Sequence, residues 1–378
     1  MQSSIFSEEH ELFRETVRRF FREAVEPFSA EWERKEQVPR ELWLQAGELG
    51  LLCPSIPETY GGAGGDFLYN VIVAEEIGYA IGGGSVAFSA HSDIVAYYLL
   101  GHAAEELKQE WLPKMVTGEC LTSIAMTEPG AGSDLKAIKT RAVRDGDHYV
   151  LNGAKTFITN GLDADLVVVA CKTNPEAGAK GISLIAVDTR LPGFRRGKTL
   201  EKIGQRASGT VELFFDDLRV PQQCLLGEEG AGFAIMMEEL PRERLNIAIR
   251  AHTSALRAYE ETVSYVKQRS VFDQAVFDFQ TCKHALAEIN TDLAVGRAFL
   301  DQCLSQMLRN TLTPEAAAMA KLWLAEMEWR SLDRCLQLHG GYGYMMEYPI
   351  ARLFVDARSR RIYGGSSEIM REFVARKI

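Results

Sequence analysis

Three things are missing from this sequence of 378 residues, and each absence excludes a class of protein. The chain has no apolar run long enough to cross a bilayer, so we expect no membrane insertion. Its seven cysteines are dispersed and form no CxxC pair, which argues against a disulfide framework or a zinc site and indicates reduced thiols. Positive charge is in deficit, and the net charge of −10 argues against nucleic acid as a partner.

A secretory leader is also missing from the first residues. The stretch MQSSIFSEEHELF becomes acidic at Glu8 and contains no apolar core of the kind that a signal peptide requires. We therefore expect a cytoplasmic protein if the source is bacterial, or a protein of the mitochondrial matrix if this is a processed mature chain. With 46% hydrophobic and 25% charged residues, the composition is that of a globular protein, and the length predicts two or three domains.

The hydrophobic period changes twice along the chain, and the changes divide it into three segments. Residues 1–120 carry apolar side chains at helical spacing, for example between Leu12 and Val25. Residues 121–228 contain one Asp-Gly and two Asn-Gly pairs between β-branched runs, a pattern typical of hairpin turns. Residues 229–378 return to long helical patterns.

These patterns predict an α+β fold of three domains with those boundaries. We expect an N-terminal helical domain and then a compact antiparallel β domain, closed as a barrel or packed as a sandwich, with the barrel favoured. A C-terminal four-helix bundle follows, in which one helix is capped by Thr313 and has Pro314 in its first turn.

One short stretch near the C-terminus, RIYGGSSEIMREF at residues 361–373, combines a flexible backbone with a helix start. Gly364 and Gly365 give the main chain freedom and offer no side chain. The Ser-Ser-Glu sequence that follows is typical of a helix N-terminus. The stretch therefore predicts a close approach of the backbone to another group, followed by a capped helix.

Four motifs resemble segments of the acyl-CoA dehydrogenase family: AMTEPGAGSD at 125–134, TFITNG at 156–161, QLHGGYGYMMEYP at 337–349 and IYGGSSEI at 362–369. They occur in order and cover essentially the whole chain, and ELPRERL together with IYGGSSEI is most similar to the long-chain subgroup. The resemblance implies FAD-dependent α,β-dehydrogenation of an acyl-CoA thioester, a homotetramer, and an electron-transfer flavoprotein as acceptor. Residues 88–100 are expected to line the pocket for the acyl tail, whose length and branching stay open.

The same resemblance implies which residues hold FAD. Hydroxyl and backbone N–H groups of the β domain are expected to bind the polar edge and the phosphates, while Phe157, where many relatives carry Trp, covers a face of the flavin. A neighbouring subunit is expected to hold the adenine end, and Asp273 stands there where relatives often have glycine. The implied residues are Thr127, Ser133, Phe157, Thr159, Arg269, Phe272, Gln280, Gln337, Gly341, Ser366 and Glu368.

The catalytic base is displaced from its position in many relatives. Short- and medium-chain members carry a glutamate where this chain has Gly364, which retains only its backbone N–H as a donor to the thioester carbonyl. In the long-chain and isovaleryl subgroups a glutamate at the position of Glu243 does this work, so we expect Glu243 to be the base. The alternative is that Pro241 and Glu243 form an ordinary first turn of a helix. Arg244 and Ser133 are implied contacts of the CoA portion and the thioester arm.

Two other functions stay open at this point. An acyl-CoA oxidase of the same fold would use oxygen as its electron acceptor, although such chains usually carry an extra C-terminal domain. A non-catalytic flavin-containing binding protein, acting on nucleic acid or as a scaffold, would need a strongly basic bundle, whereas the charges after residue 230 are roughly balanced. Oxygen consumption without an acceptor protein would favour the first function, and tight DNA binding without flavin reduction would favour the second.

Overall fold

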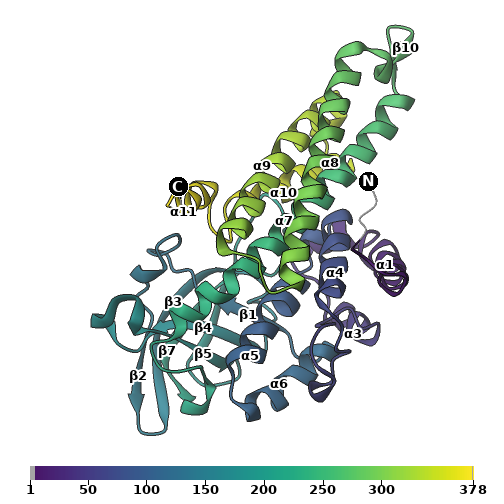
Figure 1. Ribbon diagram of the computed structural model, residues 1–378. Helices are drawn as coiled ribbons and strands as arrows, with labels where there is room; N and C mark the ends of the chain where they lie inside the picture. The colour runs from purple at the N-terminus through teal and green to yellow at the C-terminus, as the bar shows by residue number, and fades with distance from the viewer. Residues whose placement is uncertain (1–4, 377) are drawn as a thin grey trace.

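The computed structural model describes residues 5–376 and 378, and it divides into three units in chain order (Figure 1). Residues 1–4, which open the stretch inspected for a signal peptide, lie outside the described residues. The N-terminal unit is helical, as predicted. Its helices are α1 (Glu8–Phe20), α2 (Ser29–Lys35), α3 (Arg40–Glu48), α4 (Phe67–Tyr79), α5 (Ala96–His102) and α6 (Glu105–Thr117), with π-helical turns at Phe21–Val25 and Ala90–Val95.

Local sequence explains how this unit is organised. α1 begins at a capping box in which Ser7 and His10 bond reciprocally. α4 is apolar on nearly all sides, and it is accordingly buried between α1 and the long helix α7 (Gly232–Gln268). The last two helices, α5 and α6, share a core with the sheet that follows.

The middle unit is one mixed sheet. Its strands are β1 (Thr122–Ala125), β2 (Arg141–Asp145), β3 (His148–Ile158), β4 (Leu166–Lys172), β5 (Ile182–Asp188), β6 (Phe194–Thr199), β7 (Val211–Pro221) and β8 (Leu225–Leu226). They lie in the order β6-β7-β3-β2-β4-β5-β8, and β1 pairs with β4. Most neighbours are antiparallel, but β1 and β2 both run parallel to β4.

The predicted closed barrel is wrong. β6 and β8 stand at the two ends of the strand order, and each pairs with one neighbour, so the sheet stays open. Barrel closure requires hydrogen bonds between strands that are distant in the sequence, together with a matching tilt and register. Local turn patterns do not encode that pairing, which is why they predicted the β domain but not its closure.

Two of the three glycine turns form as predicted. Gly146 has a positive φ and closes the β2–β3 hairpin, and Gly161 lies in a turn after β3. Gly153, in contrast, lies inside β3 at a shift of register against β7, where a Cβ would overlap Thr140. This Asn-Gly pair is therefore a bulge rather than a turn, because the close approach of another backbone requires glycine there.

The C-terminal unit is a helical bundle with a hairpin at its far end (Figure 1). Besides α7, its helices are α8 (Gln280–Leu308), α9 (Pro314–Leu338), α10 (Pro349–Ala357) and α11 (Ser367–Ala375). The hairpin of β9 (Ser270–Val271) and β10 (Gln274–Ala275) joins α7 to α8. Two predicted caps are confirmed, since Thr313 caps α9 and Ser366 caps α11. Three helices are long, and the shorter α10 packs against α7 and α9.

α7 connects the three units. Its 37 residues span about 55 Å. Ile235 and Met236, in its first turn, belong to the core shared by α5 and the sheet, whereas its later turns pack against α4, α8 and α9. The candidate site is built on the first third of this helix.

The described residues contain neither a membrane-spanning helix nor a disulfide. Among them, no helix is both long and apolar enough to cross a bilayer. The seven cysteines are free, and most of them are buried. Buried thiols of this kind are held in the protonated form, because burial raises the pKa of Cys53 to about 12.

Candidate active site

A buried carboxylate occupies the first third of α7. Glu243 is 8% exposed, and its Oε1 accepts a hydrogen bond of 2.9 Å from the hydroxyl of Tyr98 in α5. The helix begins at Gly232 and continues through Pro241. Glu243 is therefore not a first-turn residue, and the alternative that assigned it to an ordinary helix start is wrong.

Burial raises the pKa of Glu243 to about 7, because a low-dielectric environment disfavours the carboxylate. The hydrogen bond from Tyr98 acts in the opposite direction. The negative charge of Glu239 raises the pKa further, and the positive charges of Arg244 and Arg242 lower it. A carboxyl group with this pKa suits a general base, since it is partly ionised near neutrality and still basic enough to accept a proton.

The two arginines next to Glu243 in the sequence have other partners. Arg242 forms an ion pair with Glu239. Arg244 is buried, and its Nε donates to the carbonyl oxygen of Gly364 over 3.4 Å. Its guanidinium also lies over the ring of Phe373, 5.1 Å from the ring centroid, and the predicted contact between Arg244 and CoA stays a prediction.

The glycine pair approaches α7 from the segment between α10 and α11. Gly364 has a φ of 65° and Gly365 a φ of 96°, in the left-handed region that favours glycine. A Cβ at Gly364 would overlap Cδ1 of Ile247, which lies one helical turn after Glu243. The structure therefore brings the predicted base and the predicted backbone donor to the same stretch of α7.

Thr127, Phe157 and Thr159 lie close together on the β unit. The N–H of Thr156 donates to the carbonyl of Thr127 over 3.0 Å, which places the loop after β1 beside the end of β3. Phe157 has a φ of 60° and is 68% exposed, although a large aromatic side chain is ordinarily buried. Ser133 is exposed further along the same loop.

A buried ion pair holds this loop in place. Nζ of Lys155 lies 2.8 Å from Oε1 of Glu128 and also donates to the carbonyl of Met126. The Glu128 carboxylate in turn accepts hydrogen bonds from the N–H groups of Lys139 and Thr140. These bonds tie both ends of the loop to β3. The loop that carries Thr127 is therefore held beside the end of β3 that carries Phe157.

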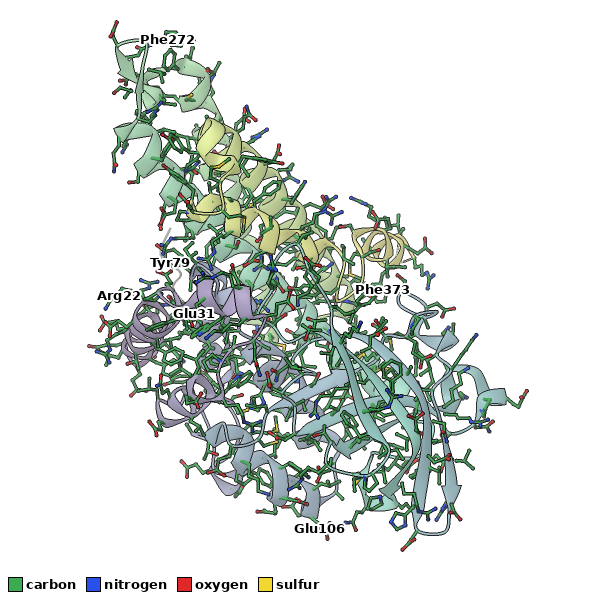
Figure 2. The ribbon with its side chains drawn as sticks, turned by 180° about the vertical axis from the view of Figure 1, so that it is seen from behind. Arg22, Glu31, Tyr79, Glu106, Phe272 and Phe373 are labelled. Carbon is green, nitrogen blue, oxygen red and sulfur yellow. The ribbon has the colours of Figure 1, made fainter. Side chains whose placement is uncertain are left out.

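Phe272 and Asp273 lie at the far end of the bundle, in the turn of the β9–β10 hairpin. Phe272 is 89% exposed at the tip (Figure 2). Both residues have a positive φ. Aspartate is one of the residues that tolerate this conformation, so the hairpin forms without the glycine that relatives often have there.

A cavity of about 470 Å³ lies beside this hairpin and is lined by Arg269 and Gly341 among others. Gln280 and Gln337 are exposed at the ends of α8 and α9 that meet this region. The hairpin and the sheet stand at opposite ends of the molecule (Figure 1). One cofactor can therefore contact both groups of predicted residues only if a second copy of the chain contributes one of them.

Ser366 and Glu368 form a third group, at the start of α11. The Ser366 hydroxyl accepts the N–H of Ile369 over 3.3 Å as a helix cap, and Glu368 is exposed. Both lie directly after the glycine pair rather than on the sheet or the hairpin. Their contacts with FAD stay predictions.

The predicted residues on the sheet and those at the far end of the bundle fit FAD. An exposed aromatic ring with hydroxyl groups beside it suits the flat flavin and its polar edge, and Phe157 with Thr127 and Thr159 provides that surface. An exposed aromatic side chain suits adenine and a guanidinium suits phosphate, and the far end of the bundle provides these in Phe272 and Arg269.

Sequence patterns missed two buried polar residues that contact Glu243 and the glycine pair. Tyr98 lies in the run VAYYLL, which has the pattern of a core helix, and its partner Glu243 is 145 positions away. Lys321 is buried in α9, and its Nζ donates to the carbonyl of Gly365 over 2.5 Å. The only sign of Lys321 in the sequence is a lysine within an otherwise apolar stretch of helix.

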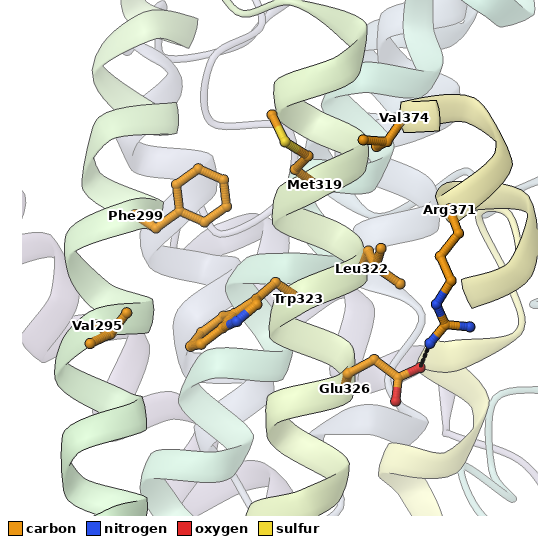
Figure 3. A pocket seen from close by; sticks show the side chains of 8 residues that line it. All are labelled: Val295, Phe299, Met319, Leu322, Trp323, Glu326, Arg371 and Val374. Atoms are coloured by element: carbon orange, nitrogen blue, oxygen red, sulfur yellow. Dashed lines mark ion pairs between the residues drawn. The ribbon is translucent and has the colours of Figure 1, made fainter. Parts of the chain in front are cut away.

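A groove of about 450 Å³ lies on the outside of the bundle, between α8, α9 and α11 (Figure 3). Its walls are mostly apolar, and Glu326 and Arg371 form an ion pair of 3.5 Å at its edge. Glu243 lines neither this groove nor the cavity beside the hairpin. Neither of them is therefore a pocket that the predicted base would line.

Three family models match almost the whole chain in succession. The N-terminal domain of acyl-CoA dehydrogenases matches residues 7–119, the middle domain residues 123–218 and the C-terminal domain residues 230–378. The order of the three matches is the order of the three units in the structure.

Individual proteins are similar over their full length. The chain is 50% identical to the mitochondrial long-chain specific acyl-CoA dehydrogenase of Sus scrofa, covering 99% of this chain and 87% of the relative. The crystal structure of an acyl-CoA dehydrogenase from Geobacillus kaustophilus is 47% identical with a TM-score of 0.97, covering 100% and 99% of the two chains. A glutaryl-CoA dehydrogenase from Mycobacterium smegmatis in complex with FADH2 is 28% identical with a TM-score of 0.92, covering 98% and 95%.

Proposed function

This chain belongs to the acyl-CoA dehydrogenase family, and from that premise we propose that it uses FAD to oxidise acyl-CoA thioesters to trans-2-enoyl-CoA. The electrons pass to an electron-transfer flavoprotein. The observation that carries the proposal is the position of Glu243, a buried carboxylate with a pKa of about 7, on the stretch of α7 that Gly364 approaches.

The proposed reaction begins with the α-proton of the thioester. Glu243 accepts this proton, and its burial keeps water away and maintains its basicity. The backbone N–H of Gly364 donates to the thioester carbonyl and stabilises the negative charge that develops on its oxygen. When bound, FAD supplies the acceptor for the β-hydrogen, which leaves as a hydride.

Long-chain or branched acyl groups are the proposed substrate class. The support is the 50% identity to a long-chain specific relative and the glutamate at position 243 instead of 364. The tail pocket is assigned to residues 88–100, the segment that carries Tyr98 and enters α5.

The proposed assembly is a homotetramer in which each FAD is shared between two chains. The sharing is supported by the separation of the sheet residues from the hairpin residues within one chain (Figure 1). The proposed compartment is the cytoplasm for a bacterial source, or the mitochondrial matrix for a processed mature chain.

Anaerobic titration tests the proposed function directly. Purified protein with its flavin would be mixed with acyl-CoA thioesters of graded length and branching, and the flavin absorbance would be followed. We expect bleaching by at least one long or branched acyl-CoA, and reoxidation that is fast with an electron-transfer flavoprotein and slow with oxygen. Equally efficient reoxidation by oxygen would favour the oxidase, and no bleaching by any acyl-CoA would contradict the proposal.

A further inference from the structure

Lys321 occupies an unusual position for a lysine. It is 0% exposed in the middle of the bundle, and its Nζ donates to the carbonyl oxygen of Gly365 over 2.5 Å. Glu326, whose charge also acts on Lys321, forms its ion pairs with Arg361 and Arg371 instead. The hydrogen-bond partner of this buried ammonium group is therefore a backbone carbonyl rather than a carboxylate.

Keeping an ammonium group in this position is unfavourable for folding. Burial lowers the pKa of Lys321 to about 8, and the nearby positive charge of Arg244 lowers it further. An apolar side chain of similar length would fill the same space without that cost. A stability role alone is therefore a poor explanation for the lysine, and its contact with the glycine pair suggests another.

The carbonyl groups of both consecutive glycines accept hydrogen bonds from side chains. Arg244 in α7 donates to the carbonyl of Gly364, and Lys321 in α9 donates to the carbonyl of Gly365. On the preceding side, the N–H groups of Ile362 and Tyr363 both bond to the carbonyl of Ser359, over 2.9 and 3.1 Å. The backbone is thus held before and after Gly364 by groups from three different elements.

We propose that Lys321 is a positioning residue that fixes the Gly364–Gly365 backbone so that the Gly364 N–H is aimed at the thioester carbonyl. This inference rests on the proposed function. Two consecutive glycines with positive φ can adopt many other conformations, so their geometry must be imposed by neighbours. In this chain, side chains from α7 and α9 restrict the backbone of the glycine pair, because the glycines have no side chain that would do so.

The test compares Lys321→Met with the parent holoenzyme. Removing one oxyanion-hole donor typically costs about 10²–10³-fold in rate, and a displaced donor should cost less, so we expect anaerobic flavin reduction to slow about 10- to 100-fold. FAD content and melting temperature should change little, because the lost hydrogen bond is offset by the removal of a buried charge. Lys321→Gln retains a donor and should lie between Lys321→Met and the parent.

A second ligand separates positioning from general structural support. A 3-oxoacyl-CoA forms an enolate readily and has no β-hydrogen to transfer, so its binding reports on stabilisation of the carbonyl charge. We expect Lys321→Met to weaken binding of this enolate by the same factor as the rate, with little loss of affinity for the saturated acyl-CoA. Ser367→Ala is the matched control, since it removes an anchor between α11 and Glu326 but leaves the glycine carbonyls bound.

The outcomes distinguish this inference from the proposed function. Parent-like reduction and enolate binding in Lys321→Met would overturn the positioning role, as would a lower melting temperature with an unchanged rate. If the methionine variant does not fold, the same comparisons apply to Lys321→Gln. Failure of any acyl-CoA to bleach the parent flavin would instead contradict the proposed function itself.

Discussion

The single residue on which the proposed chemistry depends is Glu243, and its ionisation sets the pH range of the reaction. Its pKa is raised by burial to about 7, so the carboxylate form is lost as the pH falls through that value. Activity that requires this carboxylate should therefore decline below about pH 7. Tyr98 opposes the effect of burial, because its hydroxyl donates to the ionised form.

Tyr98→Phe should accordingly move the acid limb of kcat/KM to higher pH. The phenyl ring keeps the packing and removes the donor, so the pKa of Glu243 should rise and less of it should be ionised at neutrality. The measurement is the pH profile of anaerobic flavin reduction. Tyr149→Phe is the matched control, since Tyr149 is also buried and donates to a glutamate, Glu229, in the β unit. An unmoved limb, or one shifted to lower pH, would show that Tyr98 does not act on the base.

Moving the base to its position in short-chain relatives should fail without a further change. In Glu243→Gly combined with Gly364→Glu, the new side chain would overlap Cδ1 of Ile247 and would require a positive φ. Adding Ile247→Val removes that methyl group and leaves only the strain of the positive φ, so the triple variant should reduce flavin faster than the double variant. Equal rates for the double and triple variants would contradict this account of the glycine site.

The sequence predicts only some of the residues of the proposed site. Glu243 and Gly364 were predicted because they occupy motif positions, and the structure places them on facing segments. Tyr98 and Lys321 join the proposed site through contacts with residues far away in the chain. Tyr98 has the pattern of a core helix, and Lys321 departs from that pattern only as a single lysine, so the three-dimensional packing is needed to identify them.

Among the described elements, the β9–β10 hairpin projects from the far end of the bundle and carries an exposed aromatic side chain at its tip (Figure 1). Its exposed Phe272 contributes little to the folding of its own chain. In the proposed assembly it contacts the FAD held by a second copy, and a ligand bound across an interface stabilises that interface.

Phe272→Ala should therefore weaken flavin retention and assembly together. We expect a lower FAD-to-protein ratio after dilution, a shift toward smaller species in sedimentation velocity, and little change in the fold of the isolated chain. Leu12→Ala is the matched control, because Leu12 is an exposed apolar residue of α1. Full FAD retention by a monodisperse monomer would argue against a shared site.

Helix starts were easier to predict from the sequence than the arrangement of the sheet. The starts of α9 and α11 were predicted accurately, because their capping residues Thr313 and Ser366 accept hydrogen bonds from their own first turns. The Gly153 bulge and the open sheet were missed, because both depend on contacts with segments distant in the chain.

For the whole molecule, the order of helical, β and helical units was predictable, since the hydrophobic period changes near residues 120 and 230 and the three units follow those changes. What the sequence could not supply is how α7 passes from the sheet to the bundle and so carries Glu243 to the glycine pair. That arrangement joins the three units into one proposed active site.

The most direct test of this account is the rate of anaerobic flavin reduction by a saturating acyl-CoA in Glu243→Gln. The amide keeps the shape of the side chain but cannot accept the α-proton, so we expect a loss of at least about 10²–10⁴-fold while FAD content and acyl-CoA binding stay near those of the parent. Glu239→Gln, one turn earlier on α7, should retain most of the rate. A Glu243→Gln rate within a few-fold of the parent would mean that the base lies elsewhere.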